Sequence, residues 1–577
     1  MTNFNFFTTS LKSTLSKQIT TLLLVFTLIF GFYTEGSSQC ACTNCGCTDS
    51  LELVKLYNAT NGASWTKKWI LTDSLKNWYG VTLANSRVTK IYLNSNQLNG
   101  QIPNLNLSNL EMLSLNSNQL TGKIPNFNLP NLQVLSLSAN QLSDTIPNFD
   151  LLPNLRVLDV RSNRLTGTIP NFNLPLLLDL YVNSNRLTGS IPNLNLPNLR
   201  YFLLGYNQLS GEIPNFDMPE LLDLYLEFNQ LSGPIPNFNL PKLMSLFIYS
   251  NQLSGTMPNF NLPRLQELRC QSNKLTGLMQ TFNAPNLTLF HADNNQLVGA
   301  IPNLNLPNLR ELYLNDNQLT TLPNFNLPRL SQLYLNNNKL TGQLPNFTLP
   351  NLGYLYLQNN KLTDTIPNFD MPYLATFNLS FNQLSGAIPN FNFPRLYSFY
   401  LNNNQLNGTI PNLNIPKIFH LHLNNNKLSG MIPNFNLPSL QQLYLGNNQL
   451  TGCIPSEIKI NCPLIGETGG TVSGNVNLST WNWSAYWRSS EGACPPTAVA
   501  HTQENNGRLY PNPAHDFLFL EGFEKASKIL IYNVLGSLVL NKNANGKGID
   551  ISHLSNGIYT IRIVSGEKSA ARLFIKN

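Results

Sequence analysis

The feature of this 577-residue sequence that most constrains its fold is a unit of 22 residues that recurs between residues 87 and 455. Each unit carries the triplet Asn-Gln/Arg/Lys-Leu, and the asparagine of this triplet occurs seventeen times, at Asn96, Asn118, Asn140, Asn163, Asn185, Asn207, Asn229, Asn251, Asn273, Asn295, Asn317, Asn338, Asn360, Asn382, Asn404, Asn426 and Asn448. Only one spacing of 23 and one of 21 depart from the period. Such a repeat indicates units that bury their apolar faces only by stacking on their neighbours. We therefore expect a solenoid.

The residue pattern of the repeat indicates the kind of solenoid. Residues 132–142 read LQVLSLSANQL, which resembles the leucine-rich-repeat pattern LxxLxLxxNxL. The continuation at residues 120–125, LTGKIP, resembles the LxGxIP variant known from plant receptor ectodomains, although the unit here is about two residues shorter. The resemblance implies a leucine-rich-repeat solenoid with a parallel β-sheet on its concave face.

Local physics supports the same fold. The alternation in LxL predicts a short strand whose two leucines point inward. The prolines after Ile and in Leu-Pro-Asn disfavour helix, so we expect a non-helical convex side. The repeated asparagine is expected to be buried and to bond backbone groups that the turn leaves unpaired. Cys270, in the second leucine position of its LxL, is expected to be a buried small hydrophobe.

The N-terminus reads as an export signal. Lys12 and Lys17 precede an apolar run at residues 22–32, and small polar residues follow at 36–39. This order predicts a signal peptide over residues 1–39 that is cleaved near Gln39, and no membrane span after its removal. Lipidation at Cys40 is disfavoured, because Ser-Ser-Gln lacks the usual Leu-x-Gly/Ala before such a cysteine.

Cysteines and tryptophans flank the repeats. In an exported chain we expect disulfides among Cys40, Cys42, Cys45 and Cys47 and a capping disulfide among Cys453, Cys462 and Cys494, with a metal site as the alternative for the first cluster. Residues 40–86 are predicted to form a Cys-rich segment and a helical cap, with a helix over 51–57 that Asp49 or Ser50 caps, and with Trp65, Trp69 and Trp78 over the first coil. Residues 456–506, with Trp481, Trp483 and Trp487, are predicted to be a C-terminal cap and linker.

The last segment, residues 507–577, differs in character. Short alternating apolar runs separated by turn residues predict a small β-sandwich. The pieces YPNP at 510–513, IYNVLG at 531–536 and LSNGIY at 554–559 resemble the C-terminal sorting domain of the type IX secretion system. That resemblance implies a Bacteroidetes source, the type IX machinery as a partner, and a location outside the cell or on its outer surface.

Function in such a solenoid is expected on the strand residue between the two leucines of LxL, because this side chain points out of the sheet. Nine of the seventeen residues in this column are aromatic. We predict ligand binding by eight of them, Tyr181, Tyr225, Phe247, Tyr313, Tyr334, Tyr356, Tyr400 and Tyr444. Rings beside amide side chains suit a glycan or an extended peptide. The alternative is a cross-strand ladder that only stabilises the sheet.

The sequence gives little support for nucleic-acid binding, catalysis or metal binding. Charged residues make up 11% of the chain, against roughly 25% in typical soluble domains. No basic run indicates nucleic acid, no catalytic motif is present, and Asp159, Arg161, Glu227 and Asp293 read as scattered charges. His420 and His422 share a strand face, which is weak evidence for a metal. We predict no catalytic residue, metal or cofactor, and a secreted or cell-surface, non-enzymatic protein for recognition or adhesion. The alternative is a structural, protective or ice-contacting repeat protein without a specific ligand.

Overall fold

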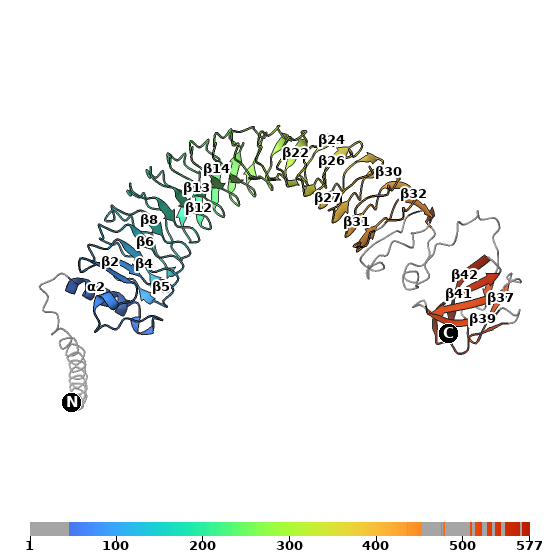
Figure 1. Ribbon diagram of the computed structural model, residues 1–577, viewed down its shortest axis with the longest axis horizontal. Coiled ribbons are helices and arrows are strands. Elements are labelled where there is room, and N and C mark those ends of the chain that lie inside the picture. Colours follow the sequence, from blue (N-terminus) through green and yellow to red (C-terminus); the bar gives the residue numbers. More distant parts are fainter. Residues whose placement is uncertain are drawn as a thin grey trace, which may run out of the picture. The chain divides into compact units, whose positions relative to one another are not determined.

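The computed structural model describes residues 46–435, 437–452, 475 and 477–478 and, in the tail, 508–510, 514–521, 528–533, 537–543, 548–565 and 568–576. The chain divides into two compact units. Figure 1 colours the described elements along the sequence, from blue at the N-terminus to red at the C-terminus. The first unit comprises Met1–Ser232 with Phe238–Leu243, and the second comprises Gly233–Asn237 with Met244–Asn577. None of the described helices has the length and apolar character needed to cross a bilayer.

Each repeat contributes one short strand to a parallel ladder, which confirms the solenoid. In the first unit the ladder strands are β2 (Arg87–Tyr92), β4 (Met112–Ser114), β6 (Val134–Ser136), β8 (Val157–Asp159), β9 (Asp179–Tyr181), β11 (Tyr201–Leu203) and β13 (Asp223–Tyr225). In the second they are β15 (Ser245–Phe247), β17 (Glu267–Arg269), β19 (Leu289–His291), β21 (Glu311–Tyr313), β23 (Gln332–Tyr334), β25 (Tyr354–Tyr356), β27 (Thr376–Asn378), β29 (Ser398–Tyr400), β31 (His420–His422) and β33 (Gln442–Tyr444).

The ladder register places equivalent residues of successive repeats side by side. Leu333 pairs with Leu355, and Tyr334 pairs with Tyr356. The middle residue of each strand, a leucine in most repeats, is buried, while in strands such as β23 and β33 the residues on either side of it are half-buried and face outward. A column of equivalent side chains therefore runs along the sheet in steps of about 4.8 Å.

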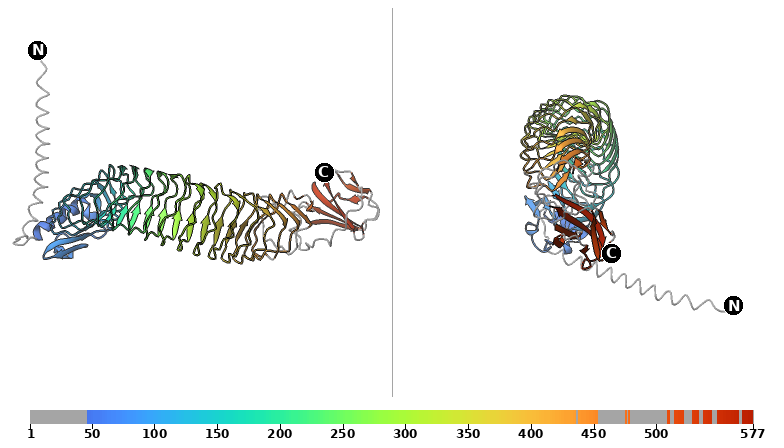
Figure 2. Two further views of the ribbon diagram at one scale, coloured as in Figure 1. Left: turned by 90° about the horizontal axis from the view of Figure 1, so that it is seen from above. Right: turned by 90° about the vertical axis from the view of Figure 1, so that its right-hand side faces the viewer.

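A second row of short strands, which the sequence patterns did not indicate, follows the consensus asparagines (Figure 2). These strands are β3 (Asn99–Gln101), β5 (Gln119–Gly122), β7 (Gln141–Leu142), β10 (Thr188–Gly189), β12 (Gln208–Gly211) and β14 (Gln230–Pro234), and, after them, β16 (Gln252–Gly255), β18 (Lys274–Leu275), β20 (Val298–Ala300), β22 (Gln318–Thr321), β24 (Thr341–Gln343), β26 (Lys361–Thr363), β28 (Ser385–Gly386), β30 (Gln405–Thr409), β32 (Lys427–Met431), β34 (Gln449–Gly452) and β35 (Asn477–Leu478). No helix occurs in the described residues from 87 to 452, so the non-helical convex side is confirmed.

The consensus asparagines are internal, as expected. Asn360 donates from Nδ2 to the carbonyls of Leu335 and Leu357, each at 3.0 Å, and its Oδ1 accepts from the Leu340 amide at 3.0 Å. Asn475 continues this ladder beyond the seventeenth repeat, because its Oδ1 accepts from the Leu450 amide at 2.9 Å. The triplet pattern does not identify this member, because Asn475 lies 27 residues after Asn448 and is not followed by Gln/Arg/Lys-Leu.

The N-terminal cap consists of α2 (Gly46–Ala59), η1 (Gly62–Ser64), η2 (Leu75–Asn77) and β1 (Val81–Ala84), which pairs antiparallel with β2. Trp69 packs against Trp65 and Trp78 with ring centroids 4.8 Å from each, and all three rings are buried. The predicted N-cap role of Asp49 is wrong. The helix begins at Gly46, five residues before the predicted start, so that Asp49 and the alternative Ser50 both lie inside it. The buried Asp49 carboxylate accepts from the Arg87 guanidinium and from the Val88 amide at 2.8 Å.

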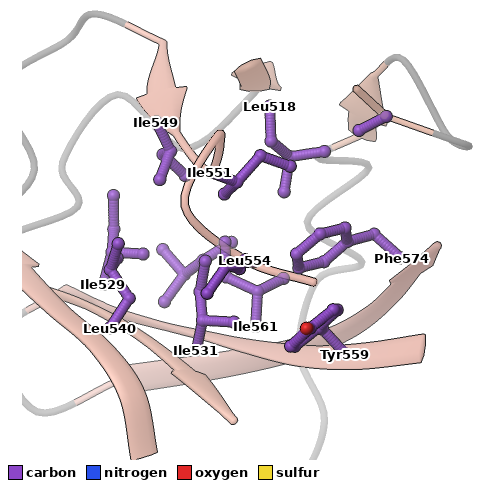
Figure 3. Packing of buried hydrophobic residues seen from close by; sticks show 12 residues of the cluster. Leu518, Ile529, Ile531, Leu540, Ile549, Ile551, Leu554, Tyr559, Ile561 and Phe574 are labelled. Atoms are coloured by element: carbon purple, nitrogen blue, oxygen red, sulfur yellow. The ribbon is translucent and has the colours of Figure 1, made fainter. Parts of the chain in front are cut away.

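The tail forms two facing sheets, which confirms the small β-sandwich. One sheet holds β36 (Arg508–Tyr510), β37 (Phe517–Glu521) and β40 (Ile549–Asp550). The other has the order β39 (Leu538–Asn543), β38 (Lys528–Asn533), β41 (Gly557–Ser565) and β42 (Lys568–Lys576). Aliphatic side chains with Tyr559 and Phe574 fill the space between them (Figure 3).

Several predictions lie outside the described residues. These are the signal peptide at 1–39, the side chains of Cys40, Cys42, Cys45, Cys47, Cys453, Cys462 and Cys494, and the tryptophans Trp481, Trp483 and Trp487. Cys270 lies inside the described part, where it is a fully buried free thiol whose burial raises its pKa, as expected for a small hydrophobe.

Candidate ligand-binding face

The outward side of the strand ladder, here called the ladder face, presents three columns of side chains. The middle column is the one predicted from LxL. The first column comes from the residue two positions earlier, such as Gln332 beside Tyr334, and the third from the residue two positions later, such as Asn336. The three columns follow from the alternation of side chains along an extended backbone.

In the second unit four middle-column rings form one continuous group, the aromatic stack of His291, Tyr313, Tyr334 and Tyr356. Ring centroids are 3.9 Å apart for His291 and Tyr313, 4.4 Å for Tyr313 and Tyr334, and 4.5 Å for Tyr334 and Tyr356. The repeat step along the sheet is close to the stacking distance of aromatic rings, which explains the arrangement. The His291–Tyr313 and Tyr334–Tyr356 pairs are stacked, with interplanar angles of 6° and 29°, and Tyr313 and Tyr334 are tilted by 48°. Neighbouring rings therefore cover much of each other's faces, and ring edges are left to face outward.

The first column fixes the stack by hydrogen bonds. The Tyr313 hydroxyl donates to Gln332 Oε1 at 2.6 Å, and Gln332 Nε2 donates to Glu311 Oε1 at 3.2 Å. His291 Nε2 lies 3.2 Å from Glu311 Oε2. Burial raises the pKa of Tyr334 to about 12, so its phenol is a neutral donor. Burial, and then the charge of Arg269, lowers the pKa of His291 to about 4, so its imidazole is neutral.

A second aromatic group follows after Asn378 in the same unit. Tyr400 and His422 meet edge to face at 4.7 Å, and His422 and Tyr444 do so at 4.3 Å. His422 Nε2 lies 3.2 Å from Gln442 Oε1, and burial lowers the His422 pKa to about 4. Within the residues that the structure describes, no set of three His, Cys, Asp or Glu side chains is placed to hold a metal ion.

Phe247 has a different partner. The guanidinium of Arg269 lies over its ring at 4.9 Å from the centroid. Arg269 also contacts Glu267 Oε2 at 3.3 Å. The face of the Phe247 ring is thus covered by the Arg269 guanidinium of the chain itself.

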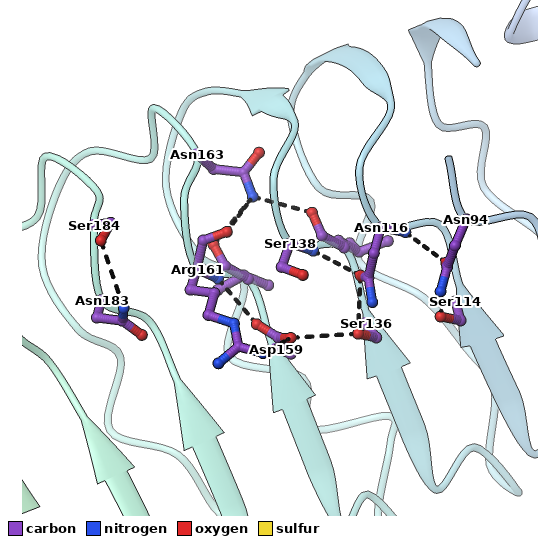
Figure 4. A network of polar contacts seen from close by, with 12 residues as sticks. Asn94, Ser114, Asn116, Ser136, Ser138, Asp159, Arg161, Asn163, Asn183 and Ser184 are labelled. Atoms are coloured by element: carbon purple, nitrogen blue, oxygen red, sulfur yellow. Dashed lines mark hydrogen bonds and ion pairs between the residues drawn. The ribbon is translucent and has the colours of Figure 1, made fainter. Parts of the chain in front are cut away.

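In the first unit the predicted rings Tyr181 and Tyr225 are separated by Leu203 of the intervening strand. Arg161 lies over the Tyr181 ring at 5.0 Å and contacts Asp159 Oδ2 at 3.3 Å (Figure 4). Burial raises the pKa of Asp159, and the Arg161 charge opposes this shift. Burial, followed by the charge of Asp179, raises the pKa of Tyr181 to about 12.

All eight predicted residues lie on the ladder face, but they do not form one site. Tyr313, Tyr334 and Tyr356 are brought together, Tyr400 and Tyr444 join through His422, and Phe247, Tyr181 and Tyr225 stand in other surroundings. The prediction omitted His291 and His422, which are members of the same column. It also omitted exposed or half-buried first-column rings such as Tyr201 and Tyr354, which the same alternation could have identified.

Comparison with known families gives matches at both parts of the chain. The model of the secretion system C-terminal sorting domain matches residues 508–577. Leucine-rich-repeat models match residues 108–151 and 416–456, and also 154–173 and 308–328. The sorting domain indicates export by type IX secretion to the cell surface or beyond it. No curated protein matches the chain in sequence.

Among solved structures, the chain is similar to a plant peptide hormone receptor, RGFR1, in complex with RGF2. The identity is 30%, the match covers 66% of this chain and 73% of that one, and the TM-score is 0.54. It is also similar to the Leptospira interrogans leucine-rich-repeat protein LIC12759, with 29% identity over 65% of this chain and 93% of that one and a TM-score of 0.44. A plant ice-binding protein matches with 28% identity over 45% of this chain and 90% of that one, with a TM-score of 0.40.

Proposed function

We propose that this chain, which belongs to the leucine-rich-repeat family, is a non-enzymatic binding protein that holds an extended protein segment on its ladder face outside the cell. The LxGxIP subtype, a Bacteroidetes source and a role in adhesion are parts of the same proposal.

The observation that carries the proposal is the orientation of the aromatic stack. A sugar ring stacks on an open aromatic face, and the faces inside the stack are taken by neighbouring rings at 3.9 to 4.5 Å. Ring edges remain, and a phenol oxygen whose proton is already donated, as that of Tyr313 is to Gln332, can still accept a hydrogen bond. These groups suit a peptide, whose N–H groups donate to oxygens and whose apolar side chains contact ring edges. The stack thus favours a peptide over a glycan.

The third column supplies matching polar groups beside the stack. Asn336 and Gln358 flank Tyr334 and Tyr356, and within the described residues Gln358 Oε1 is buried without a hydrogen-bond partner. A buried acceptor without a donor costs free energy, and a peptide amide would supply the missing donor. Three steps from His291 to Tyr356 span about 14 Å, which is about four residues of extended peptide running along the column.

The structural relative supports this class of ligand. The plant receptor that shares 30% identity with the chain was solved with a peptide hormone. A peptide on the repeats is therefore compatible with the fold, and the ladder face is where this chain gathers aromatic and amide side chains.

A second candidate function is purely structural, and the interlocking of the rings favours it. Cross-strand aromatic pairs stabilise a sheet without any ligand. The two functions differ in what the loss of the rings would change, namely ligand capture in one and only stability in the other.

Parallel screens of the secreted chain on a displayed peptide library and on a glycan array would test the proposal. We expect enrichment of peptides by the native chain, a blank glycan array, and loss of the enriched peptides in a Tyr334, Tyr356 and Tyr400 to alanine triple variant. Glycan capture with no peptide enrichment would contradict the choice of ligand. Blank results on both would favour the structural role.

A further inference from the structure

Two arginines on the ladder face show how this surface holds a guanidinium group. Arg161 pairs with Asp159 at 3.3 Å and lies over the ring of Tyr181 in the next strand. Arg269 pairs with Glu267 at 3.3 Å and lies over the ring of Phe247 in the preceding strand. In both cases a carboxylate of the same strand region and a ring of a neighbouring strand hold the cation.

A third carboxylate on the ladder face, that of Glu227 in the first unit, has no arginine of the chain paired with it among the described residues. Asn183, Gly205 and Glu227 are successive residues of the third column, here called the acceptor site. A Cβ atom on Gly205 would lie 2.3 Å from Glu227 Oε1, so the absence of a side chain lets Glu227 fold back along the ladder over this strand. The backbones of Asn183 and Glu227, which lie two strands apart, are separated by about 10 Å. Because the Glu227 side chain extends over Gly205, its carboxylate lies nearer to Asn183 than its backbone does.

Both ends of the acceptor site present an oxygen that lacks a donor. Glu227 is only 8% exposed, and its Oε2 has no hydrogen-bond partner among the residues that the structure describes. The same holds for Asn183 Oδ1, while Asn183 Nδ2 points to Ser184 Oγ at 3.5 Å on the other side of the amide (Figure 4). Native proteins rarely leave a buried carboxylate oxygen unpaired, which points to a donor that the chain itself does not supply.

The surroundings are aromatic and carry charges of both signs, because Arg161 lies over the ring of Tyr181. Tyr181 and Tyr225 stand in the middle column of the strands on either side of Gly205, and Asp179 lies in the first column beside Tyr181. Burial raises the pKa of Asp179, against the opposing effects of a hydrogen bond from Tyr181 and of the Arg200 charge. Burial raises the pKa of Glu227, as expected for a carboxyl group that no cation neutralises.

We propose that the acceptor site is a subsite for the guanidinium group of an arginine in a peptide ligand, held by Glu227 Oε2 and Asn183 Oδ1. A guanidinium carries five donors in one plane and can bridge two separated acceptors, whereas a single ammonium is a compact point charge. This proposal rests on the proposed function in one respect, namely that the ladder face is the binding face. It names the chemical group that the first unit recognises.

Fluorescence anisotropy with a fluorescein-labelled triarginine peptide tests the proposal on the full secreted chain. A tricitrulline peptide of the same length is the probe control, because citrulline keeps the shape of arginine without its charge. We expect the native chain to bind triarginine and to bind tricitrulline about tenfold or more weakly, and Glu227→Gln to lose about tenfold or more in triarginine affinity. Glu212→Gln, an exposed carboxylate of the same unit, should bind as the native chain does.

Two further variants keep the test independent of any one substitution. Asn183→Ala removes the second acceptor and should weaken triarginine binding, and Gly205→Arg places a resident guanidinium beside Glu227 and should block the probe. Unfolding curves establish that each variant is folded. Equal affinity of Glu227→Gln and the native chain for triarginine, or equal affinity of the native chain for both probes, would overturn the subsite. The Tyr334, Tyr356 and Tyr400 triple variant should retain triarginine binding, so a failure of the proposed function remains distinguishable.

Discussion

The side chain of Asn360 and the backbone of Leu335, which lie 25 residues apart in sequence, are joined by a hydrogen bond of 3.0 Å from Nδ2 to the carbonyl oxygen. The same amide bonds Leu357 O and accepts from the Leu340 amide, so one side chain ties three backbone segments of two coils together. Each repeat carries an equivalent residue, and this asparagine ladder is what closes the turn after every strand.

Replacing Asn360 with alanine should therefore destabilise the second unit. Two carbonyls and one amide would lose their partner inside the protein, and we expect a loss of about 2–4 kcal/mol in the free energy of unfolding. Asn346→Ala, at an exposed position of the neighbouring coil, is the control and should change stability by no more than about 0.5 kcal/mol. Chemical denaturation of the two variants gives the comparison, and equal stabilities would contradict a structural role for the ladder.

The cap depends on Asp49 in a similar way. Its carboxylate accepts from Arg87 and from the Val88 amide while only 1% of the residue is exposed. Asp49→Ala would leave the Arg87 cation and a buried amide without this partner, and we expect a loss of about 2–4 kcal/mol together with earlier unfolding of the cap. Tryptophan fluorescence follows the cap through Trp65 and Trp69. Asp73→Ala, with an exposed side chain, should leave the transition in place.

The neutral histidines of the ladder face give the second unit a dependence on acid. The pKa values of His291 and His422 lie at about 4 in the folded chain, below the ordinary value of 6.5. The unfolded chain therefore binds more protons between pH 6.5 and 4, and the stability that these residues contribute is lost as the pH falls through this window. The polar and charged neighbours of His291 are Glu311 and Arg269, and those of His422 are Gln442 and His420.

A His291→Gln and His422→Gln double variant should therefore lose less melting temperature between pH 6.5 and 4 than the native chain does. The carboxyl groups titrate in both proteins, so the difference between the two curves isolates the histidines. His553→Gln, exposed in the tail, is the matched control. Parallel curves for the double variant and the native chain would show that the two imidazoles are not held neutral.

The fold was largely predictable because the length of the repeat sets the register in which successive strands pair. A period of 22 residues aligns each LxL with the next, and alternation then determines which side chains are buried. Features without a period were harder to predict. Asn475 performs the task of a consensus asparagine outside the triplet pattern, and the start of α2 was misplaced because the cap signal of Asp49 serves a tertiary contact with Arg87.

The candidate site was predictable only as a column. The sequence indicates that Tyr334 and Tyr356 point outward, but the stacking of their rings depends on side-chain rotamers and on the strand spacing, and the proposed preference for a peptide over a sugar rests on this stacking. From the sequence, Glu227 was interpreted as one of several scattered charges. Its contact with Gly205 could not be predicted, because the two residues are 22 positions apart and only the strand register brings them together.

The most direct test of the account is the affinity of a library-selected peptide for the native chain and for the Tyr334, Tyr356 and Tyr400 to alanine triple variant. A Tyr206, Tyr373 and Tyr397 to alanine variant removes the same number of exposed rings elsewhere and is the control. Truncation of three rings at a binding face should raise the dissociation constant about a hundredfold or more, with an unchanged circular dichroism spectrum and unchanged affinity in the control. Equal affinities of the native chain and the ladder-face variant would contradict the claim that the aromatic stack binds the ligand.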